Sequence, residues 1–506
     1  MYVRRTSPGV YGPAPPVVGR SLRCRPAADD VQPRTGERGP VHRRARSVLR
    51  RSPNDKEPAM STAARVLAPP APDELGEVLV PGDPAYDDAA RTFFAAGTPD
   101  VVLRPRDVAQ VQAAVQYAVA AGLEISVRSG GHSGAGLSTH TSGAVIDLAH
   151  LDGIDVDPAR RLVRVGVGAT WGAVADTLQE YDLGISSGDT RSVGVGGLAL
   201  GGGIGWMVRE HGLTIDAIVA AQVVTADGAV HEIDETHEPD LFWAVRGGGG
   251  NVGVVTRLDL IAQPVAGVQF GTITYAVADV PWLITRWRDV MRAADRRLSS
   301  TLVLMPGMMG NAPSVLLTVC FADDDEAGAD AAIEPLLGIG EVLRCDLAQL
   351  PYAQVLADEQ GLPPGLRMVV RNALPSELTD DLVWAIDKAW TDRDVMVALR
   401  SLGGAVADVA PDATAFAHRD AEVMLQIGGV VPPGAPDPLA SRWPAVAAQA
   451  EGGAYAGFLS TADADDVAAV FPEPTRRRLA HTKAEYDPAN VFHRNHNVPP
   501  ATHEEA

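Results

Sequence analysis

The sequence predicts an α+β protein whose ligand-binding regions are glycine-rich loops at the ends of strands. Short apolar strands alternate with amphipathic helices from about residue 99 onwards. Glycine clusters follow several of these strands, at the places where open sheets bind their ligands. From about residue 263 the pattern changes to longer, partly alternating strands with separate amphipathic helices. The two patterns together predict a glycine-loop region followed by a region built on a sheet with helices.

The first region shows clear start and stop signals. Pro105 ends a strand, Asp107 caps the helix that follows, and Gly122 ends that helix. Thr170 is expected to cap a second helix, and residues 155–158 are expected to form a turn. The expected strands are residues 100–105, 124–129, 143–148 and 161–168, with a further strand in 212–230 that runs to a hairpin turn at Asp227-Gly228.

The second region is expected to combine partly alternating strands with amphipathic helices. Ser376 or Thr379 is the expected cap of one of its helices. Its expected strands are residues 267–277, 313–322 and 421–431, and its expected helices are residues 280–294 and 376–392.

Composition excludes several classes of function. The chain has 506 residues, enough for two or three domains, and a formal charge of −21, which argues against a nucleic-acid partner. It has no run of eighteen apolar residues, so no membrane span is expected. Its cysteines, Cys24, Cys320 and Cys345, are scattered without metal-ligand spacing, so no metal site is expected.

The N-terminal segment differs from the rest of the chain. Residues 1–59 hold twelve arginines and nine prolines with almost no apolar periodicity, which predicts disorder. Met60 is a candidate for the true start, and a transit-like arm is the alternative. The segment lacks the apolar stretch of a secretory signal, so we expect a cytoplasmic protein.

Three glycine-rich stretches carry the functional signal. The first, VRSGGHSGAGLSTH at 127–140, places His132 in a loop otherwise nearly free of large side chains. The second, at 186–206, has eight glycines in 21 residues, and backbone N–H groups free of side chains can hold a diphosphate. The third, at 240–260, contains Asn251, which suits a left-handed turn or a polar ring edge. Two alternatives for the second stretch are a turn cluster without ligand and a dinucleotide fingerprint at 194–199.

In combination, these stretches make the chain similar to a known family. It resembles the FAD-linked oxidases of the berberine-bridge-enzyme-like group, within the vanillyl-alcohol-oxidase and p-cresol-methylhydroxylase (PCMH-type) fold family. The resemblance spans roughly residues 75–500. The matching pieces are VRSGGHS at 127–133, SVGVGGLALGGGIGWMVREHGLTID at 192–216, PDLFWAVRGGGGNVGVVT at 239–256, SLGGAVADVAPDATAFAHRD at 401–420 and YDPANVFHRNHNVPP at 486–500.

The resemblance implies that FAD is bound covalently. In the family, the histidine at the position of His132 bonds to the 8α-methyl carbon of the flavin, and a cysteine forms a second link in many members. Thr190 stands in place of that cysteine, so a single covalent link through His132 is expected. The alternative is a polar loop histidine without a bond. The implied cofactor contacts are Arg128, Ser129, Gly130, Gly131, His132 and Ser133; Val193, Gly194, Gly196, Gly197, Leu198, Gly201, Gly202, Gly203 and Gly205; Asn251, Gly253, Val254 and Val255; and Asn495 and Asn497.

The resemblance also implies catalytic residues, with departures from the family pattern. Tyr455 matches the tyrosine of a Y-x-N motif that often serves as catalytic base, but Gly457 replaces the asparagine. A tyrosine base requires a phenol pKa depressed from about 10, and a core tyrosine on a strand is the alternative. Gln426 is expected to face flavin and substrate. Leu198 replaces a family histidine, and Val193 falls at the position that controls oxygen access.

The Asn495 and Asn497 segment is expected along the polar edge of the flavin, because amides supply both donors and acceptors; a simple C-terminal turn is the alternative.

The implied function is an FAD-dependent oxidation of a small molecule. The expected reaction oxidises an alcohol, or a carbon bearing nitrogen, of a sugar or secondary metabolite by hydride transfer to flavin N5. Oxygen is the expected acceptor, giving hydrogen peroxide; the alternatives are a dehydrogenase with another acceptor and a flavin-binding carrier without turnover. The substrate and the oligomeric state stay open. The expected domains are an FAD-binding domain at 60–262, a substrate-binding domain at 263–452, and a segment at 453–506 that completes the FAD-binding domain.

Overall fold

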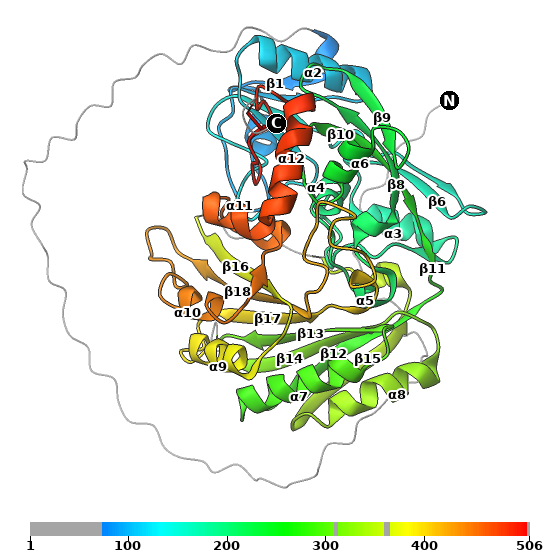
Figure 1. Ribbon diagram of the computed structural model, residues 1–506, viewed down its shortest axis with the longest axis vertical. Coiled ribbons are helices and arrows are strands. Elements are labelled where there is room, and N and C mark those ends of the chain that lie inside the picture. Colours follow the sequence, from blue (N-terminus) through cyan, green and yellow to red (C-terminus); the bar gives the residue numbers. More distant parts are fainter. Residues whose placement is uncertain (1–72, 308–311, 359–364, 503–506) are drawn as a thin grey trace, which may run out of the picture.

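Three extended sheets and the helices around them make up the computed structural model, which describes residues 73–307, 312–358 and 365–502. The predictions for residues 1–59 and for Met60 lie outside the described residues. Figure 1 shows the glycine-loop region in the upper half and the largest sheet below it, with α7, α8 and α9 on the outer face of that sheet. This is the two-part α+β architecture that the sequence predicts.

A small sheet of four strands presents the first glycine loop. Its strand order is β1-β2-β4-β3, and β2, β4 and β3 are parallel. Asp107 caps α2 by accepting a hydrogen bond from the N–H of Gln110, as predicted, and Gly122 follows the helix with a φ of +63°. The elements are β1 (Glu77–Leu79), β2 (Val101–Arg104), α2 (Val108–Ala120), β3 (Ile125–Arg128) and β4 (Ala144–Asp147), with the short helix α1 (Tyr86–Ala89).

A second sheet of five strands is antiparallel throughout. The expected turn at residues 155–158 is wrong, because Ile154–Asp157 pairs with β6 as the edge strand β5. Its aspartates occupy alternate positions beside Ile154 and Val156, and the turn falls after them, where Arg161 has a φ of +55°. In sheet order the strands are β5, β6 (Leu162–Gly166), β10 (Val254–Ile261), β8 (Ile218–Val224) and β9 (Val230–Asp234).

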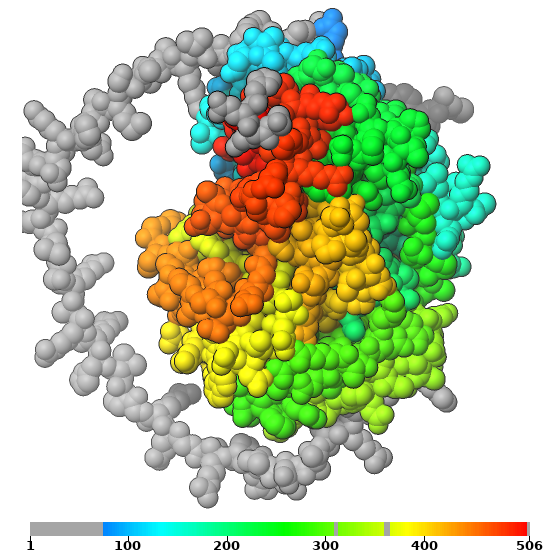
Figure 2. Space-filling model, in the orientation of Figure 1, coloured from blue at the N-terminus to red at the C-terminus, as the bar shows by residue number. Residues whose placement is uncertain are grey.

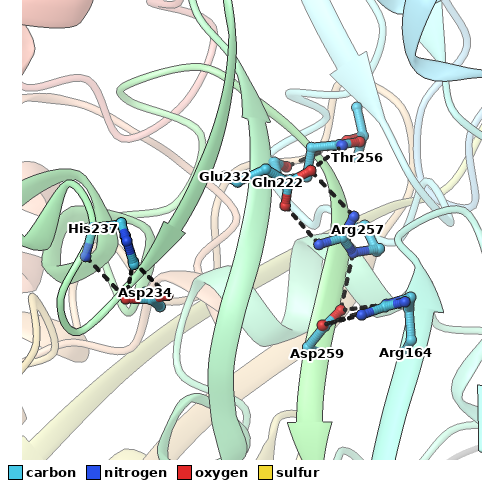
Figure 3. A network of polar contacts seen from close by, with 8 residues as sticks. All are labelled: Arg164, Gln222, Glu232, Asp234, His237, Thr256, Arg257 and Asp259. Atoms are coloured by element: carbon cyan, nitrogen blue, oxygen red, sulfur yellow. Dashed lines mark hydrogen bonds and ion pairs between the residues drawn. The ribbon is translucent and has the colours of Figure 1, made fainter.

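One face of this sheet carries a polar network and the other faces the core. Arg164 and Arg257 both donate to Asp259, at 3.0 and 2.9 Å, and Arg257 also donates to Glu232 at 2.7 Å (Figure 3). The neighbouring Leu258 side chain is fully buried. Because side chains alternate along a strand, the charged residues cover one face while the leucines fill the core on the other.

The largest sheet has eight strands, and all its neighbouring strands are antiparallel. Thr379 caps α9, and the predicted alternative Ser376 does not. In sheet order the strands are β15 (Val342–Leu350), β12 (Val268–Tyr275), β14 (Ser314–Phe321), β13 (Leu298–Met305), β17 (Met396–Ser401), β18 (Val423–Val431), β16 (Arg367–Pro375) and β19 (Gly452–Gly453); the covering helices are α7 (Val280–Ala293), α8 (Glu326–Leu337) and α9 (Asp380–Ala389).

The chain returns to the upper half at its C-terminal end. Tyr455, Phe471 and Leu479 belong to the same buried cluster as the strands of the first two sheets. Figure 2 shows the C-terminal residues in red beside the cyan and green surface of the first region. The remaining elements are α3 (Trp171–Gln179), β7 (Leu183–Gly184), α4 (Val195–Leu200), α5 (Val208–His211), α6 (Pro239–Val245), β11 (Gln263–Pro264), α10 (Trp443–Ala447), α11 (Ala464–Val470) and α12 (Glu473–Tyr486). Across the described residues, no helix is long and apolar enough to cross a bilayer.

Arg209 joins the upper half to the large sheet. This residue of α5 is 7% exposed, and its guanidinium donates to the carbonyls of Leu298 at 2.6 Å, Leu402 at 3.1 Å and Met291 at 3.3 Å. The Met291 carbonyl belongs to the last turn of α7, where the helix dipole favours a positive charge. A buried cation is thereby satisfied by main-chain oxygens of the lower half.

We expect Arg209→Met to destabilise the protein by about 3 kcal/mol, because several buried carbonyls lose their donor. The measurement is the midpoint of urea unfolding followed by circular dichroism. Arg296→Met is the matched control, since Arg296 is half-exposed and pairs with Asp408 on the surface. Equal midpoints for the two variants would contradict the role assigned to Arg209.

Candidate active site

The first two glycine loops pack against each other through their backbones. A Cβ added to Gly130 would lie 2.3 Å from the nitrogen of Gly194, and one added to Gly194 would lie 2.2 Å from the nitrogen of Gly130. Ser129 joins the same loops, since its hydroxyl donates to the Val167 carbonyl at 2.6 Å and accepts from the Gly196 N–H at 3.3 Å. These predicted cofactor residues thus place the two loops side by side.

His132 is held in one orientation beside this contact. Its Nε2 lies 3.1 Å from the Ser192 hydroxyl, and the Phe93 ring stacks on it with centroids 4.2 Å apart. Burial lowers the pKa of His132, and a hydrogen bond with the Ser192 backbone opposes this more weakly. The imidazole is therefore neutral at neutral pH, so one of its two ring nitrogens carries a lone pair.

The loops leave backbone donors and space for an anionic cofactor. Within the described residues, no acceptor receives the N–H groups of residues 129–132. A Cβ at Gly197, Gly249 or Gly250 would meet nothing within 4 Å, so all three glycines border open space. Consecutive free N–H groups and a surface without side chains suit a diphosphate. The residues present therefore fit FAD.

Gly202, Gly203 and Gly205 have a different reason to be glycine. Gly202 and Gly203 have φ of +130° and +80°, and a Cβ at Gly203 would lie 2.0 Å from the Thr214 hydroxyl oxygen. A Cβ at Gly205 would lie 2.3 Å from the Ser187 carbonyl oxygen. At these positions the glycine backbone lies close to other parts of the protein, so a side chain would not fit.

Amides of the C-terminal segment meet the third glycine loop. Asn251 donates to the carbonyls of Gly248 and His496 and accepts from the Val498 N–H, so its side chain ties the two segments together. Asn497 accepts from the buried Lys483 at 3.0 Å. Asn495 donates to Gly250 at 3.1 Å, while its Oδ1 is buried without a donor. Of these three predicted amides, Asn495 has the open acceptor that a ligand N–H could use.

The other predicted cofactor residues contribute structure or backbone. Arg128 pairs with Asp147 at 2.8 Å and donates to the Ala89 carbonyl, so its guanidinium supports the loop from behind. Leu198 fills space between Gly188 and Gly203. The side chains of Val254 and Val255 are buried in the core, and Gly253 lies against Val224. Val193 and Gly201 lie at the two ends of α4. The Ser133 hydroxyl accepts a hydrogen bond from the Leu137 N–H.

Tyr455 is buried beside the second loop. Its hydroxyl accepts from the Gly203 N–H at 3.3 Å, and its ring lies among Phe416, Phe458 and Gly202. A Cβ at Gly457 would lie 2.6 Å from this ring, so the ring takes the space that a side chain at position 457 would fill. Burial raises the pKa of Tyr455 to about 12, whereas the N–H of Gly203 and the charge of Arg400 lower it. The depressed pKa that a base requires is not present before ligands bind.

Gln426 lies on β18, on the face of the large sheet opposite the covering helices. Its neighbours in sequence, Leu425 and Ile427, are in the helix-covered core, while Gln426 itself is partly exposed. Ala398 and Val303 lie in register with it on β17 and β13. These residues lie on the face of the large sheet that is turned toward the glycine-loop region (Figure 1).

Four residues that contact these groups were not singled out from the sequence: Phe93, Asn372, Arg400 and Asp189. Asn372 makes two hydrogen bonds to the backbone of Tyr455, and Arg400 pairs with Asp189 at 2.5 Å. Asn372 lies 83 positions from Tyr455 and Arg400 lies 211 positions from Asp189, so no local pattern in the sequence could have revealed these contacts. Ser192, which contacts His132, lies directly before the glycine motif and could have been noticed there.

The cysteines do not reach the loops. Thr190 donates to Asp189 at 3.2 Å, and the described cysteines, Cys320 and Cys345, lie on β14 and β15 of the large sheet and are not joined by a disulfide. In the described residues, no group of three or more potential ligands could hold a metal ion. A thiol for a second flavin link is therefore missing from the described loops.

Comparisons with known proteins show the family to which the chain belongs. The FAD binding domain family matches residues 99–234, and the berberine and berberine-like family matches residues 475–499. (R)-6-hydroxynicotine oxidase of Paenarthrobacter nicotinovorans is 31% identical over 467 residues, which cover 84% of this chain and 97% of that protein. The chain belongs to the berberine-bridge-enzyme-like family of FAD-linked oxidases. It is therefore an FAD-linked oxidoreductase that acts on a small molecule.

Solved structures of this oxidase family share the fold. The crystal structure of 6-hydroxy-D-nicotine oxidase from Arthrobacter nicotinovorans superposes with a TM-score of 0.76 at 29% identity, over 84% of this chain and 98% of that one. Xylooligosaccharide oxidase from Myceliophthora thermophila C1, in complex with xylobiose, has a TM-score of 0.75 at 23% identity over 84% of this chain and 97% of that one. The second likeness shows the fold alone.

We expect Gly197→Leu to weaken FAD uptake by at least about tenfold while leaving the midpoint of unfolding of the FAD-free oxidoreductase unchanged. The leucine side chain enters open space in the protein but occupies the surface where the cofactor is expected. Fluorescence quenching of added FAD measures the uptake. Gly130→Ala should instead lower the midpoint of unfolding, because its Cβ would meet the backbone of Gly194. Normal uptake by Gly197→Leu would place the cofactor elsewhere.

Proposed function

We propose that this protein is an oxidase that binds FAD through a single covalent bond at His132 and oxidises an alcohol or an amine-bearing carbon, with oxygen as acceptor and hydrogen peroxide as product. The observation that carries the proposal is the setting of His132. Phe93 fixes the ring plane and burial keeps the imidazole neutral. In the tautomer whose Nε2–H donates to the Ser192 hydroxyl, Nδ1 carries the lone pair and is the proposed nucleophile.

Different residues are proposed to bind the cofactor, accept the substrate proton and orient the substrate. FAD supplies the hydride acceptor when it is bound. The free N–H groups of residues 129–132 are suited to bind its diphosphate, and Asn495 Oδ1 is suited to accept from a ring N–H. Tyr455 is the proposed base that takes the proton of the substrate hydroxyl or amine. Gln426 is proposed to orient the substrate from the sheet below.

The sheet face around Gln426 favours a substrate that is small and largely apolar. Ala398 and Val303 share this face, and Met396 and Met305 continue it two residues further along their strands; all four are partly exposed. Apolar and sulfur-containing side chains provide contact area but few hydrogen-bond partners. We therefore rank a cyclic amine or another ring-bearing metabolite above an oligosaccharide.

The deciding experiment is anaerobic bleaching of the bound flavin by a panel of substrates. The panel contains 6-hydroxynicotine and related cyclic amines, phenolic alcohols, and xylobiose as the sugar. Bleaching by an amine or phenolic alcohol, with peroxide formed when air is admitted, supports the proposal. Bleaching by xylobiose alone overturns the substrate ranking. A flavin that no compound bleaches favours the carrier alternative.

The acceptor is tested separately. Comparison of peroxide formation with the reduction of an artificial dye distinguishes the oxidase from the dehydrogenase alternative, because a dehydrogenase reduces the dye without forming peroxide. The domain boundaries at 60–262, 263–452 and 453–506, the cytoplasmic location and the residue roles stay predictions.

A further inference from the structure

The backbone of Tyr455 is fixed by one side chain on the large sheet. Asn372 of β16 accepts from the Tyr455 N–H at 2.7 Å and donates to the Tyr455 carbonyl at 2.9 Å. Asn372 is 3% exposed, so this pair of bonds is shielded from water. The glycines at 202 and 457 leave room for the ring, and Gly203 gives its N–H to the hydroxyl. The position of the phenol is therefore determined from both halves of the molecule.

Arg400 reaches the same short segment of backbone from β17. Its guanidinium donates to the Ile204 carbonyl at 3.0 Å, one residue beyond the Gly203 N–H that the Tyr455 hydroxyl accepts. It also donates to the Thr301 hydroxyl at 3.2 Å and to Asp189 at 2.5 Å, and it lies over the Trp206 ring. The Arg400 side chain is 8% exposed, so water screens its charge poorly.

Burial raises the pKa of the Tyr455 phenol most strongly; of the neighbouring charges, Arg400 lowers this pKa and Asp189 raises it. Two further ionisable groups lie on the segment beyond Phe416. Arg419 there is paired with Asp216 through two bonds of 2.9 Å, and burial lowers the pKa of His418, which keeps its ring neutral at neutral pH. Among the charged groups, Arg400 and Asp189 are thus the two that shift the pKa of the phenol, in opposite directions.

We propose that Arg400, held in place by the Ile204 carbonyl and the Thr301 hydroxyl, is a positioning residue that favours the ionised form of Tyr455 and so prepares the proton acceptor for substrate oxidation. This inference rests on the proposed function, because that function makes Tyr455 the base. In the step, the substrate O–H or N–H bond breaks and its proton passes to the phenolate oxygen, where a new O–H bond forms. The accompanying hydride is taken up by the FAD oxidant of the proposed function.

The test compares Arg400→Met and Asp189→Asn in the holoenzyme, each with and without Tyr455→Phe. Subtracting the Tyr455→Phe spectrum isolates the ultraviolet absorbance of the Tyr455 phenolate among the nine tyrosines. The comparison is made at one alkaline pH at which circular dichroism shows every variant folded. Because a nearby charge moves a pKa by about 1 unit or more, the phenolate fraction should fall about tenfold in Arg400→Met and rise about tenfold in Asp189→Asn.

The opposite directions of these two changes are the decisive readout. A merely structural ion pair would give both variants the same defect, so changes in the same direction, or no change, overturn the proposal. The double variant Asp189→Asn with Arg400→Met removes both charges and should lie between the single variants, which covers the case that Arg400→Met does not fold. Arg442→Met, whose partners are Asp392 and Asp394, should leave the phenolate signal unchanged.

The proposed function fails in a distinguishable way. If Tyr455→Phe reduces its flavin as fast as the wild type, Tyr455 is not the base and the catalytic part of the inference falls with it. Opposite ultraviolet changes would still support the control of the phenol by Arg400 and Asp189, because that measurement needs no turnover. If Tyr455 is the base, the rate of flavin reduction should follow the phenolate fraction through the variants.

Discussion

Replacing His132 with alanine should abolish the covalent attachment of FAD. After acid precipitation, the yellow colour of the wild type should stay with the polypeptide, whereas that of His132→Ala should pass entirely into the supernatant. The reason is local: the His132 ring, the proposed nucleophile, is neutral and lies against Phe93 and Ser192 beside the free N–H groups of its loop. Mass spectrometry of the wild type should find one flavin on the peptide that contains residues 127–140.

Two controls distinguish the loss of the covalent bond from a loss of the folded structure. His150→Ala should keep its covalent flavin, since His150 is a half-exposed histidine that lies near Glu77 on the surface. His132→Ala should still bind FAD reversibly, because the backbone donors and the open space at Gly197 remain. A second flavinylated peptide would contradict the argument from Thr190. Colour that stays with the His132→Ala polypeptide would place the bond at another residue.

Motifs made of neighbouring residues could be predicted from the sequence. The loop with His132, the caps at Asp107 and Thr170, and the glycine runs each depend on residues within a few positions of one another, so local pattern reveals them. The turn expected at 155–158 was wrong for the same reason. Aspartate and proline are typical of turns, but an edge strand with one face in solvent can also carry aspartates at alternate positions.

Contacts between distant segments could not be predicted. Arg209 finds its carbonyl acceptors at Met291 and Leu402, and Arg400 finds its carboxylate at Asp189, only because the two halves of the chain pack together. The sequence also indicated that every glycine in 201–205 approaches a ligand. In the structure, an added Cβ at Gly203 or Gly205 would meet protein atoms, and a single sequence cannot distinguish such a close approach from an approach to a cofactor.

Tyr455→Phe should slow the reduction of the bound flavin by substrate by about 10²- to 10⁴-fold, the usual contribution of a general base. The variant should bind FAD normally, since the ring keeps its place among Phe416 and Phe458 and loses only the hydroxyl that accepts from Gly203. Anaerobic stopped-flow absorbance measures the rate. Tyr275→Phe is the control, because Tyr275 is equally buried but donates to Leu336 in the helix-covered core of the large sheet.

The pH dependence supplies a second signature of the same residue. Burial raises the pKa of the Tyr455 phenol to about 12, so at neutral pH most molecules carry the protonated form, which cannot accept a proton. A base must be deprotonated, and below its pKa the deprotonated fraction rises about tenfold per pH unit. The rate of flavin reduction in the wild type should therefore climb steadily from neutral to alkaline pH, and this climb should vanish in Tyr455→Phe. A flat profile in the wild type would show either that substrate binding lowers this pKa below neutrality or that the proton goes elsewhere, and the residual rate of Tyr455→Phe separates the two.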